Sequence, residues 1–281
     1  EFLSAKAALK WNDPEPLKSF VNETRGLPWT DRLRYLHDEK FLQKREADYD
    51  PRAVWDQEVR RFMTVDVQGK GGRHFYIVIR AWALGGASRL LFATKVWSWE
   101  EVKQFAVEWS VKPDNLAFDA ATWTAEVYKM IVESGYKWKA LKGDDRPFFR
   151  RGDGHSIWTK SDVDPEIGTV LANRMRPIPL FLWSKPSALD RLALFMHGLA
   201  GNWLIHKGVD PEYAQQVTAY ERRERTDPRG VIHTEWHSKR ENHYADCEQM
   251  QIICAAVLEL LSAPRDPLFN QEPRPSAALS A

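Results

Sequence analysis

The sequence predicts an α/β fold with a mixed sheet, in which three antiparallel strands are joined by parallel strands and helices flank the sheet. Three observations predict it. Short apolar runs rich in β-branched and aromatic residues are separated by glycine turns. Amphipathic segments of helical period then alternate with further short apolar runs. Two of the strand-like runs end in an aspartate.

The first three strands are predicted between residues 62 and 96. Phe62–Val67 is a short run of β-forming residues, and a glycine-rich turn at 69–72 separates it from a second run at His74–Trp82. A second glycine turn then precedes Arg89–Val96. Consecutive runs joined by such short turns predict an antiparallel meander.

Two helices and two more strands follow. Ser98 and Glu101 form a capping box, and the helix that it starts carries apolar residues at three- and four-residue spacing until Pro113. Leu116–Phe118 is a short buried strand that ends at Asp119. A second helix is predicted from about 122 to 134, where Gly135 stops it, and residues 136–141 form a fifth strand.

The element order is therefore β-β-β-α-β-α-β. A right-handed crossover through a helix makes the next strand parallel to its neighbour. If the fourth strand lies beside the first, Asp66 and Asp119 come close together at the carboxyl ends of these two strands. In open α/β sheets, ligands bind in the crevice at that end of the strands. This is the ribonuclease H-like layout.

The second half has a weaker pattern. Residues 143–178 are rich in charges and glycines, which predicts an insertion or a long loop. Further elements are predicted as a strand at Pro179–Trp183, a helix at Ser187–Leu199, a helix at Pro211–Glu224 and a hairpin strand at Val231–Trp236.

A long final helix follows. Ser238 and Glu241 form a second capping box, and an apolar stripe starts near Cys247. Asp246 borders that stripe, and His243 lies one turn earlier on the same side. We expect three parts in all: a helical, charged leader at 1–60, the ribonuclease H-like domain at 61–262, and a disordered, proline-rich tail at 263–281.

The composition is that of an ordinary globular protein. The chain has 281 residues, 43% hydrophobic and 28% charged, with a net charge of +1, so bulk charge does not indicate a nucleic-acid partner. Only two cysteines are present, which argues against a disulfide framework. No apolar run reaches the ~20 residues of a membrane span, so no membrane partner is expected.

Three aspartates are the candidate catalytic residues and metal ligands: Asp66, Asp119 and Asp246. A carboxylate beside a hydrophobic run is costly to bury without a partner, and hard oxygen ligands suit Mg²⁺ or Mn²⁺. Two such ions about 3.5–4 Å apart can drive phosphodiester hydrolysis. His243 is a candidate for a supporting or proton-transfer role. Each aspartate alone could instead be an ordinary strand-end or helix-end residue.

Several segments resemble the large terminase subunit of tailed phages, the GpA type. Thr64–Gln68 resembles its VDVQ segment, and Asp119 with Thr122 resembles its second acidic motif. Asn242–Cys247 resembles its N-E-x-x-D-C motif, with His243 in place of the glutamate. Phe20–Trp29 is similar to the stretch that follows the motor domain. The resemblance covers most of residues 10–262.

This resemblance implies a nuclease half of a packaging motor. Such proteins join an ATPase domain to a ribonuclease H-like endonuclease that cuts concatemeric viral DNA in the host cell cytoplasm, together with a small terminase subunit and a portal protein. The sequence contains no G-x-x-x-x-G-K-[ST] phosphate loop, so we expect the nuclease without the motor.

Double-stranded DNA is the expected partner, and the candidate backbone contacts are basic residues near the final helix: Arg222, Arg223, Arg225, Lys239 and Arg240. A solvated charged surface is the plainer explanation of such a cluster. Two other functions remain open on the same fold: a Holliday-junction resolvase or recombinase, and a non-catalytic docking module of the packaging machinery.

Overall fold

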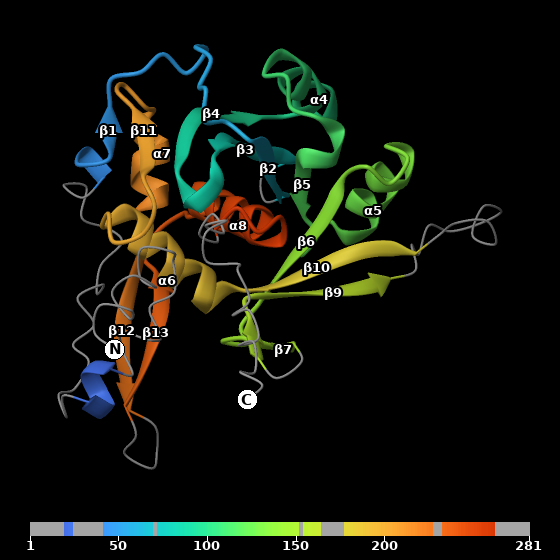
Figure 1. Ribbon diagram of the computed structural model, residues 1–281. Helices are drawn as coiled ribbons and strands as arrows, with labels where there is room; N and C mark the ends of the chain where they lie inside the picture. Colours follow the sequence, from blue (N-terminus) through green and yellow to red (C-terminus); the bar gives the residue numbers. More distant parts are fainter. Residues whose placement is uncertain are drawn as a thin grey trace, which may run out of the picture.

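The computed structural model describes residues 20–24, 42–69, 72–151, 154–163, 177–226 and 232–261. Within them a nine-stranded sheet has the order β1-β11-β4-β3-β2-β5-β6-β10-β9 (Figure 1). Its strands are β1 (Glu46–Ala47), β2 (Arg60–Gln68), β3 (His74–Trp82), β4 (Ser88–Val96), β5 (Leu116–Asp119), β6 (Lys139–Asp144), β9 (Trp158–Val163), β10 (Ile178–Ser184) and β11 (Trp203–His206). Two hairpins lie outside it: β7 (Phe149–Arg151) with β8 (Gly154–Ser156), and β12 (Tyr220–Thr226) with β13 (Ile232–Ser238).

The helices are α4 (Trp99–Glu108), α5 (Thr124–Glu133), α6 (Lys185–Met196), α7 (Pro211–Val217) and α8 (His243–Val257), with short helical turns at Phe20–Thr24, Leu84–Gly86 and Pro113–Asn115. The predicted mixed α/β fold is confirmed. The strands β2, β3 and β4 form the antiparallel meander, and β2-β5-β6 are parallel. This neighbour order is the ribonuclease H-like arrangement.

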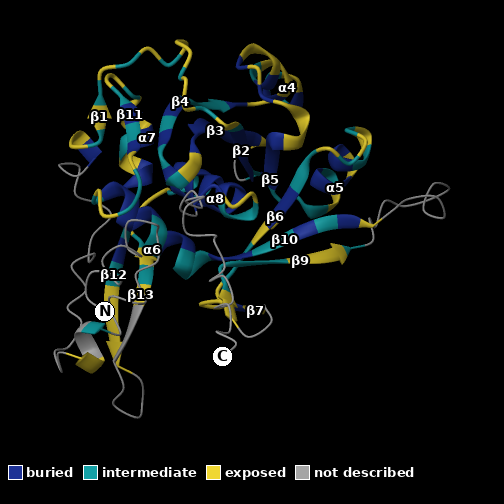
Figure 2. Ribbon diagram, in the orientation of Figure 1, coloured by how far each residue is buried: buried dark blue, intermediate teal, exposed yellow. Residues whose placement is uncertain are grey.

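The central strands of the sheet are buried, which Figure 2 shows in dark blue, and the outer strands β1 and β9 are more exposed. Side chains alternate between faces along β2. Met63, Val65 and Val67 pack in a core with α4 and α5, whereas Phe62 packs in a second core with α6, α7 and α8. Because Thr64 and Asp66 share the parity of Phe62, they point toward α8. The alternation therefore decides which residues can contribute to a site on the α8 face.

The first predicted capping box is confirmed. The backbone N–H of Glu101 donates to Ser98 Oγ at 3.2 Å, and the Glu101 carboxylate accepts from the backbone N–H of Trp97 at 3.0 Å. The second predicted box is wrong, because Ser238 belongs to β13 and α8 starts only at His243. Asn242 precedes that helix without capping it through its side chain, which donates to the Tyr220 hydroxyl instead.

Two other predictions need correction. The helix predicted at Pro211–Glu224 ends at Val217, because β12 begins at Tyr220 and pairs with β13. The β-branched Thr218 marks this change, and its hydroxyl donates back to the carbonyl of Ala214 at 2.8 Å. The region 143–178 is also no simple loop, since it holds β7, β8 and the edge strand β9. Residues 164–176, most of the leader and the tail lie outside the described residues.

Candidate active site

Asp66 ends the apolar part of the central strand β2, and its side chain is only 1% exposed. Gln68, two residues further on the same strand face, donates its amide N–H groups to both carboxylate oxygens at 2.9 Å. The imidazole Nδ1 of His243 lies 2.9 Å from Asp66 Oδ2. Asp66 is therefore held in one orientation at the carboxyl end of the strand.

Asp119 lies level with Asp66 on the neighbouring strand. The parallel register pairs Thr64 with Ala117 and Val65 with Phe118, so the next residues along both strands are the two aspartates. Neighbouring residues in register point to the same face of a sheet. Asp119 Oδ1 accepts from the backbone N–H of Ala121 at 3.0 Å, which fixes the carboxylate at the turn after β5.

Asp246, in the first turn of α8, lies near enough to Asp66 and Asp119 for their charges to raise its pKa. Its Oδ1 accepts from the Tyr220 hydroxyl at 2.9 Å and from the Gln249 side-chain amide at 2.8 Å. The helix is tied to β2, because the Thr64 hydroxyl donates to the carbonyl of Cys247 at 3.0 Å. A helix N-terminus favours negative charge, so this turn is a suitable place for a carboxylate.

The three carboxylates influence one another electrostatically. Burial and the nearby Asp66 carboxylate raise the pKa of Asp119 to about 7. The same two causes raise the pKa of Asp246 to about 7, with a smaller contribution from Asp119. Two acids whose pKa values are raised by a shared neighbour form an electrostatically frustrated site, which a cation would relieve.

His243 lies beside this cluster. Burial lowers the pKa of its imidazole, but the hydrogen bond and the charge of Asp66 outweigh burial, so that the pKa is raised overall. Its ring stacks on Tyr76 with centroids 4.5 Å apart and planes inclined by 20°. His243 is therefore packed between the Tyr76 ring and the Asp66 carboxylate.

Four further residues that the sequence does not single out lie near the aspartates: Gln68, Lys142, Lys185 and Tyr220. The charges of Lys185 and Lys142 oppose the upward shift in the pKa of Asp119. Lys185 crosses β6 at Gly143, where a Cβ atom would collide with the lysine side chain. Gln68 could have been found from the two-residue period of the strand, whereas the lysines carry no such signal.

The donor set suits a hard divalent cation, since three carboxylates supply oxygen ligands and two of them have raised pKa values. Across the part of the chain that the structure describes, however, no three Asp, Glu, His or Cys side chains lie close enough together to hold an ion. Asp66 is instead engaged by His243 and Gln68.

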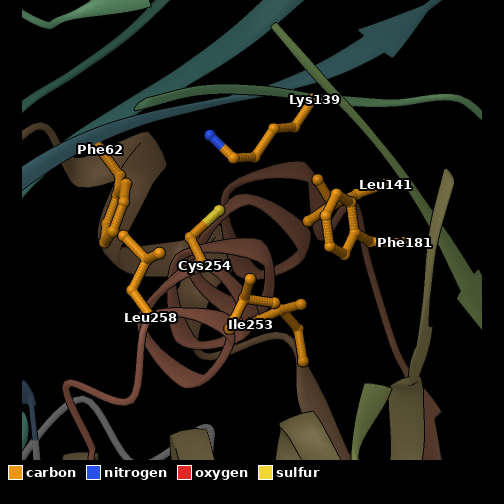
Figure 3. A pocket seen from close by; sticks show the side chains of 8 residues that line it. Phe62, Lys139, Leu141, Phe181, Ile253, Cys254 and Leu258 are labelled. Atoms are coloured by element: carbon orange, nitrogen blue, oxygen red, sulfur yellow. The ribbon is translucent and has the colours of Figure 1, made fainter. Parts of the chain in front are cut away.

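A polar cleft of about 380 Å³ opens beside Asp66, lined partly by Gln68 and His243. A second pocket lies at the other end of β2, where Phe62 and Lys139 meet the last turns of α8 (Figure 3). Its lining is apolar apart from Lys139 and the thiol of Cys254. It encloses only about 10 Å³, room for about one water. Of these two, the cleft beside Asp66 is the one with room for part of a substrate.

The predicted DNA-contact residues lie on and after the β12–β13 hairpin, most of them in ion pairs. Arg222 is bound to Asp190, while Arg223 and Lys239 both bind Glu221. Arg225 lies 3.8 Å from Glu235, and Arg240 donates to the Thr218 hydroxyl at 3.0 Å. Arg222 is mostly buried and is committed to the protein interior, whereas Arg225 is mainly exposed.

Several solved structures resemble the chain at low sequence identity. The large terminase of a thermophilic bacteriophage is 10% identical with a TM-score of 0.46, covering 80% of this chain, which spans 45% of that protein. The large terminase nuclease of the thermophilic phage G20c with bound magnesium is 8% identical, with a TM-score of 0.42, covering 77% of this chain and 95% of that one. A mutant nuclease domain from bacterial virus Sf6, with manganese and beta-thujaplicinol, is 12% identical, with a TM-score of 0.46 and coverages of 82% and 99%.

A comparison with curated proteins finds no match. None of the helices in the described ranges is long and apolar enough to cross a membrane. The sequence profile of one family, described as terminase large subunit gpA, endonuclease domain, matches residues 1–265. Since this match spans nearly the whole chain, the protein belongs to the family of gpA terminase large-subunit endonuclease domains.

Proposed function

We propose that this domain is a metal-dependent endonuclease that cuts concatemeric double-stranded viral DNA during genome packaging. Asp66, Asp119 and Asp246 are the proposed ligands of two Mg²⁺ or Mn²⁺ ions. The observation that supports this most is the placement of Asp66 and Asp119 side by side at the carboxyl ends of β2 and β5, near Asp246 on α8. Burial, together with the charge of Asp66, raises the pKa of Asp119 and that of Asp246 to about 7. Such a site gains stability when cations enter it.

The surrounding residues have distinct roles in this proposal. Gln68 orients Asp66, and Tyr220 orients Asp246, each through a hydrogen bond at 2.9 Å. His243 supports Asp66 and can exchange a proton at Nδ1. Divalent ions bound by these carboxylates would neutralise the phosphate and activate a water.

The partners follow from the family. The chain spans 45% of the thermophilic-phage large terminase that it resembles. The partners of a complete large terminase are therefore proposals for this chain. We infer that the domain works with double-stranded DNA, the small terminase subunit and the portal protein in the host cell cytoplasm. The basic residues Arg222, Arg223, Arg225, Lys239 and Arg240 stay candidates for contacts with the DNA backbone.

Cleavage of supercoiled plasmid tests the activity. Wild-type protein should nick and linearise plasmid with Mn²⁺ or Mg²⁺ and do neither in EDTA. Asp119→Asn should lose at least about 10³-fold in rate, because a neutral amide oxygen is a much weaker ligand for a divalent cation than a carboxylate. The matched control is Asp144→Asn, another strand-end aspartate, which is paired with Arg146. Equal activity in the two variants would remove Asp119 from the site.

Two measurements separate this proposal from the alternatives. Titration calorimetry should show Mn²⁺ binding that Asp119→Asn weakens and Asp144→Asn does not. A protein that binds no Mn²⁺ in the millimolar range would instead be a docking module. Strong preference for four-way junctions over linear duplex would favour a resolvase.

A further inference from the structure

The cleft beside Asp66 is formed where the end of β2, the start of β3 and the end of β4 lie side by side. Gln68 at the end of β2 pairs with His74 at the start of β3, and Phe75 pairs with Val96 near the end of β4. The cleft of about 380 Å³ is lined from these strands and their ends by Gln68, His74, Tyr76, Lys95 and Trp97, and from the start of α8 by Glu241, Asn242 and His243. Two of its lining residues, Gln68 and His243, also contact the Asp66 carboxylate.

Trp97 presents an aromatic face to this cleft. Trp97 is 58% exposed, although it directly follows the buried Val96 at the end of β4. The ring is supported from within by His74, with centroids 5.2 Å apart, and its backbone N–H is held by the Glu101 carboxylate at 3.0 Å. A large, partly exposed aromatic ring on a fixed backbone is therefore available for stacking in this cleft.

Lys95 places a positive charge over the rings of Trp97 and Tyr76. Its Nζ lies 5.1 Å from the centre of the Trp97 ring and 5.0 Å from that of Tyr76. Within the described residues, no carboxylate forms an ion pair with Lys95, in contrast to most basic residues of the β12–β13 hairpin. An aromatic face next to a cation matches the two parts of a nucleotide, its base and its phosphate.

We propose that this cleft binds one unpaired nucleotide of the DNA substrate, with the base stacked on Trp97 and its phosphate near Lys95. The nucleotide must be unpaired, because a base inside a duplex has its faces covered by its neighbours. This inference rests on the proposed function, and it specifies the substrate further: DNA that is frayed or single-stranded close to the scissile phosphate.

The position of the cleft carries the last step. Gln68 and His243 line it, and both contact the Asp66 carboxylate at 2.9 Å. A nucleotide held against Trp97 would thus lie in the same cleft as two side chains that contact Asp66. Binding there would position the adjoining phosphate, so the cleft would act on cleavage through substrate placement.

Binding of short duplexes in EDTA tests this without any cleavage. One duplex is blunt, and the other carries a single unpaired 2-aminopurine nucleotide at its end. Wild-type protein should prefer the overhang and quench its fluorescence by stacking. Trp97→Ala should reduce that preference by about 5- to 150-fold, the range that corresponds to losing one base–aromatic stack. Trp97→Phe should keep most of it.

The control is Phe148→Ala, which removes an aromatic side chain that is 41% exposed, near the β7–β8 hairpin. Lys95→Gln should lower the salt dependence of overhang binding by about one ion, unlike Lys103→Gln on α4. If Trp97→Ala and Phe148→Ala keep the same preference and quenching, the nucleotide site is overturned. Plasmid cleavage by the wild type is scored separately. Its failure together with a Trp97-dependent preference would reject the nuclease proposal and retain the cleft.

Discussion

Two carboxylates on α8, only two residues apart, have opposite electrostatic surroundings. Glu248 is completely buried and faces Arg80, which donates to its two oxygens from Nη2 at 2.9 Å and from Nε at 3.0 Å. Asp246 accepts hydrogen bonds from neutral groups and faces Asp66 and Asp119. Glu248 is thus paired directly with a cation of the chain, whereas Asp246 faces two further acids and is only partly compensated by the charge of Lys185. This difference is consistent with the proposal that Asp246 binds a cation from outside the chain, whereas Glu248 has a structural role.

The surroundings of Glu248 show what complete compensation looks like. The Tyr213 hydroxyl donates to it at 2.6 Å, and Arg80 also donates to the carbonyl of Leu204 at 3.0 Å while stacking over Trp203. This network joins β3, β11, α7 and α8. It fixes the helix from which Asp246 projects, so the structural pair supports the site without belonging to it.

The largest expected effect is on stability. Glu248→Gln leaves Arg80 buried without a counter-charge, and breaking a buried pair in this way costs about 3–5 kcal/mol. Asp246→Asn, two residues earlier, should cost little or should stabilise the metal-free protein. Urea unfolding in EDTA compares the two variants. Equal losses would mean that the two acids are structurally equivalent and would break the comparison.

Metal affinity should depend on pH. Protons compete with cations for Asp119 and Asp246, whose pKa values lie near 7. Mn²⁺ binding should therefore weaken as pH falls through 7, by up to about 100-fold between pH 8 and pH 6 if two protons are displaced. Calorimetry at three pH values measures this. Affinity that stays constant over that range would show that the two acids are already ionised at pH 6.

The same charges should destabilise the metal-free fold. Folding raises the pKa of Asp119 from 3.8 to about 7, so the folded protein binds the proton more tightly, and stability falls as pH rises through that interval. Asp119→Asn should thus stabilise the metal-free protein at pH 8 by about 1–2 kcal/mol and have little effect at pH 4. Thermal melts in EDTA at both pH values test the sign, with Asp144→Asn as the control.

Much of this contrast could be predicted from the sequence, but only one side of it. Asp66 and Asp119 each end an apolar strand, and the parallel crossover brings strand ends together, so local pattern and chain order were sufficient. The partnership of Arg80 and Glu248 was not predictable. Arg80 lies in a continuous buried strand, and its partner is 168 residues away on another element. No periodicity connects two such positions.

The hairpin shows a different limit. Residues 220–226 are mostly charged, and their two-residue alternation is hidden because both faces of β12 carry polar side chains. The segment forms a strand instead of the predicted helix, because it pairs with β13, where Arg222 lies opposite Trp236. Tyr220 was missed for the same reason, since its contact with Asp246 depends on the strand conformation. Tertiary pairing, rather than local propensity, determines this segment.

The smallest expected effect separates two arginines of that hairpin by the same reasoning. Arg222 is only 12% exposed and binds Asp190, which also accepts from Trp236 Nε1 at 2.7 Å. Arg225 is 75% exposed and lies 3.8 Å from Glu235. Arg222→Gln should lower stability and leave the salt dependence of DNA binding unchanged. Arg225→Gln should leave stability unchanged and reduce the slope of log affinity against log salt by about one. DNA binding at several salt concentrations and urea unfolding measure both quantities. If Arg222→Gln changes the slope instead, Arg222 contacts DNA although it is paired with Asp190. An ion pair within the protein would then not distinguish a structural arginine from one that binds DNA.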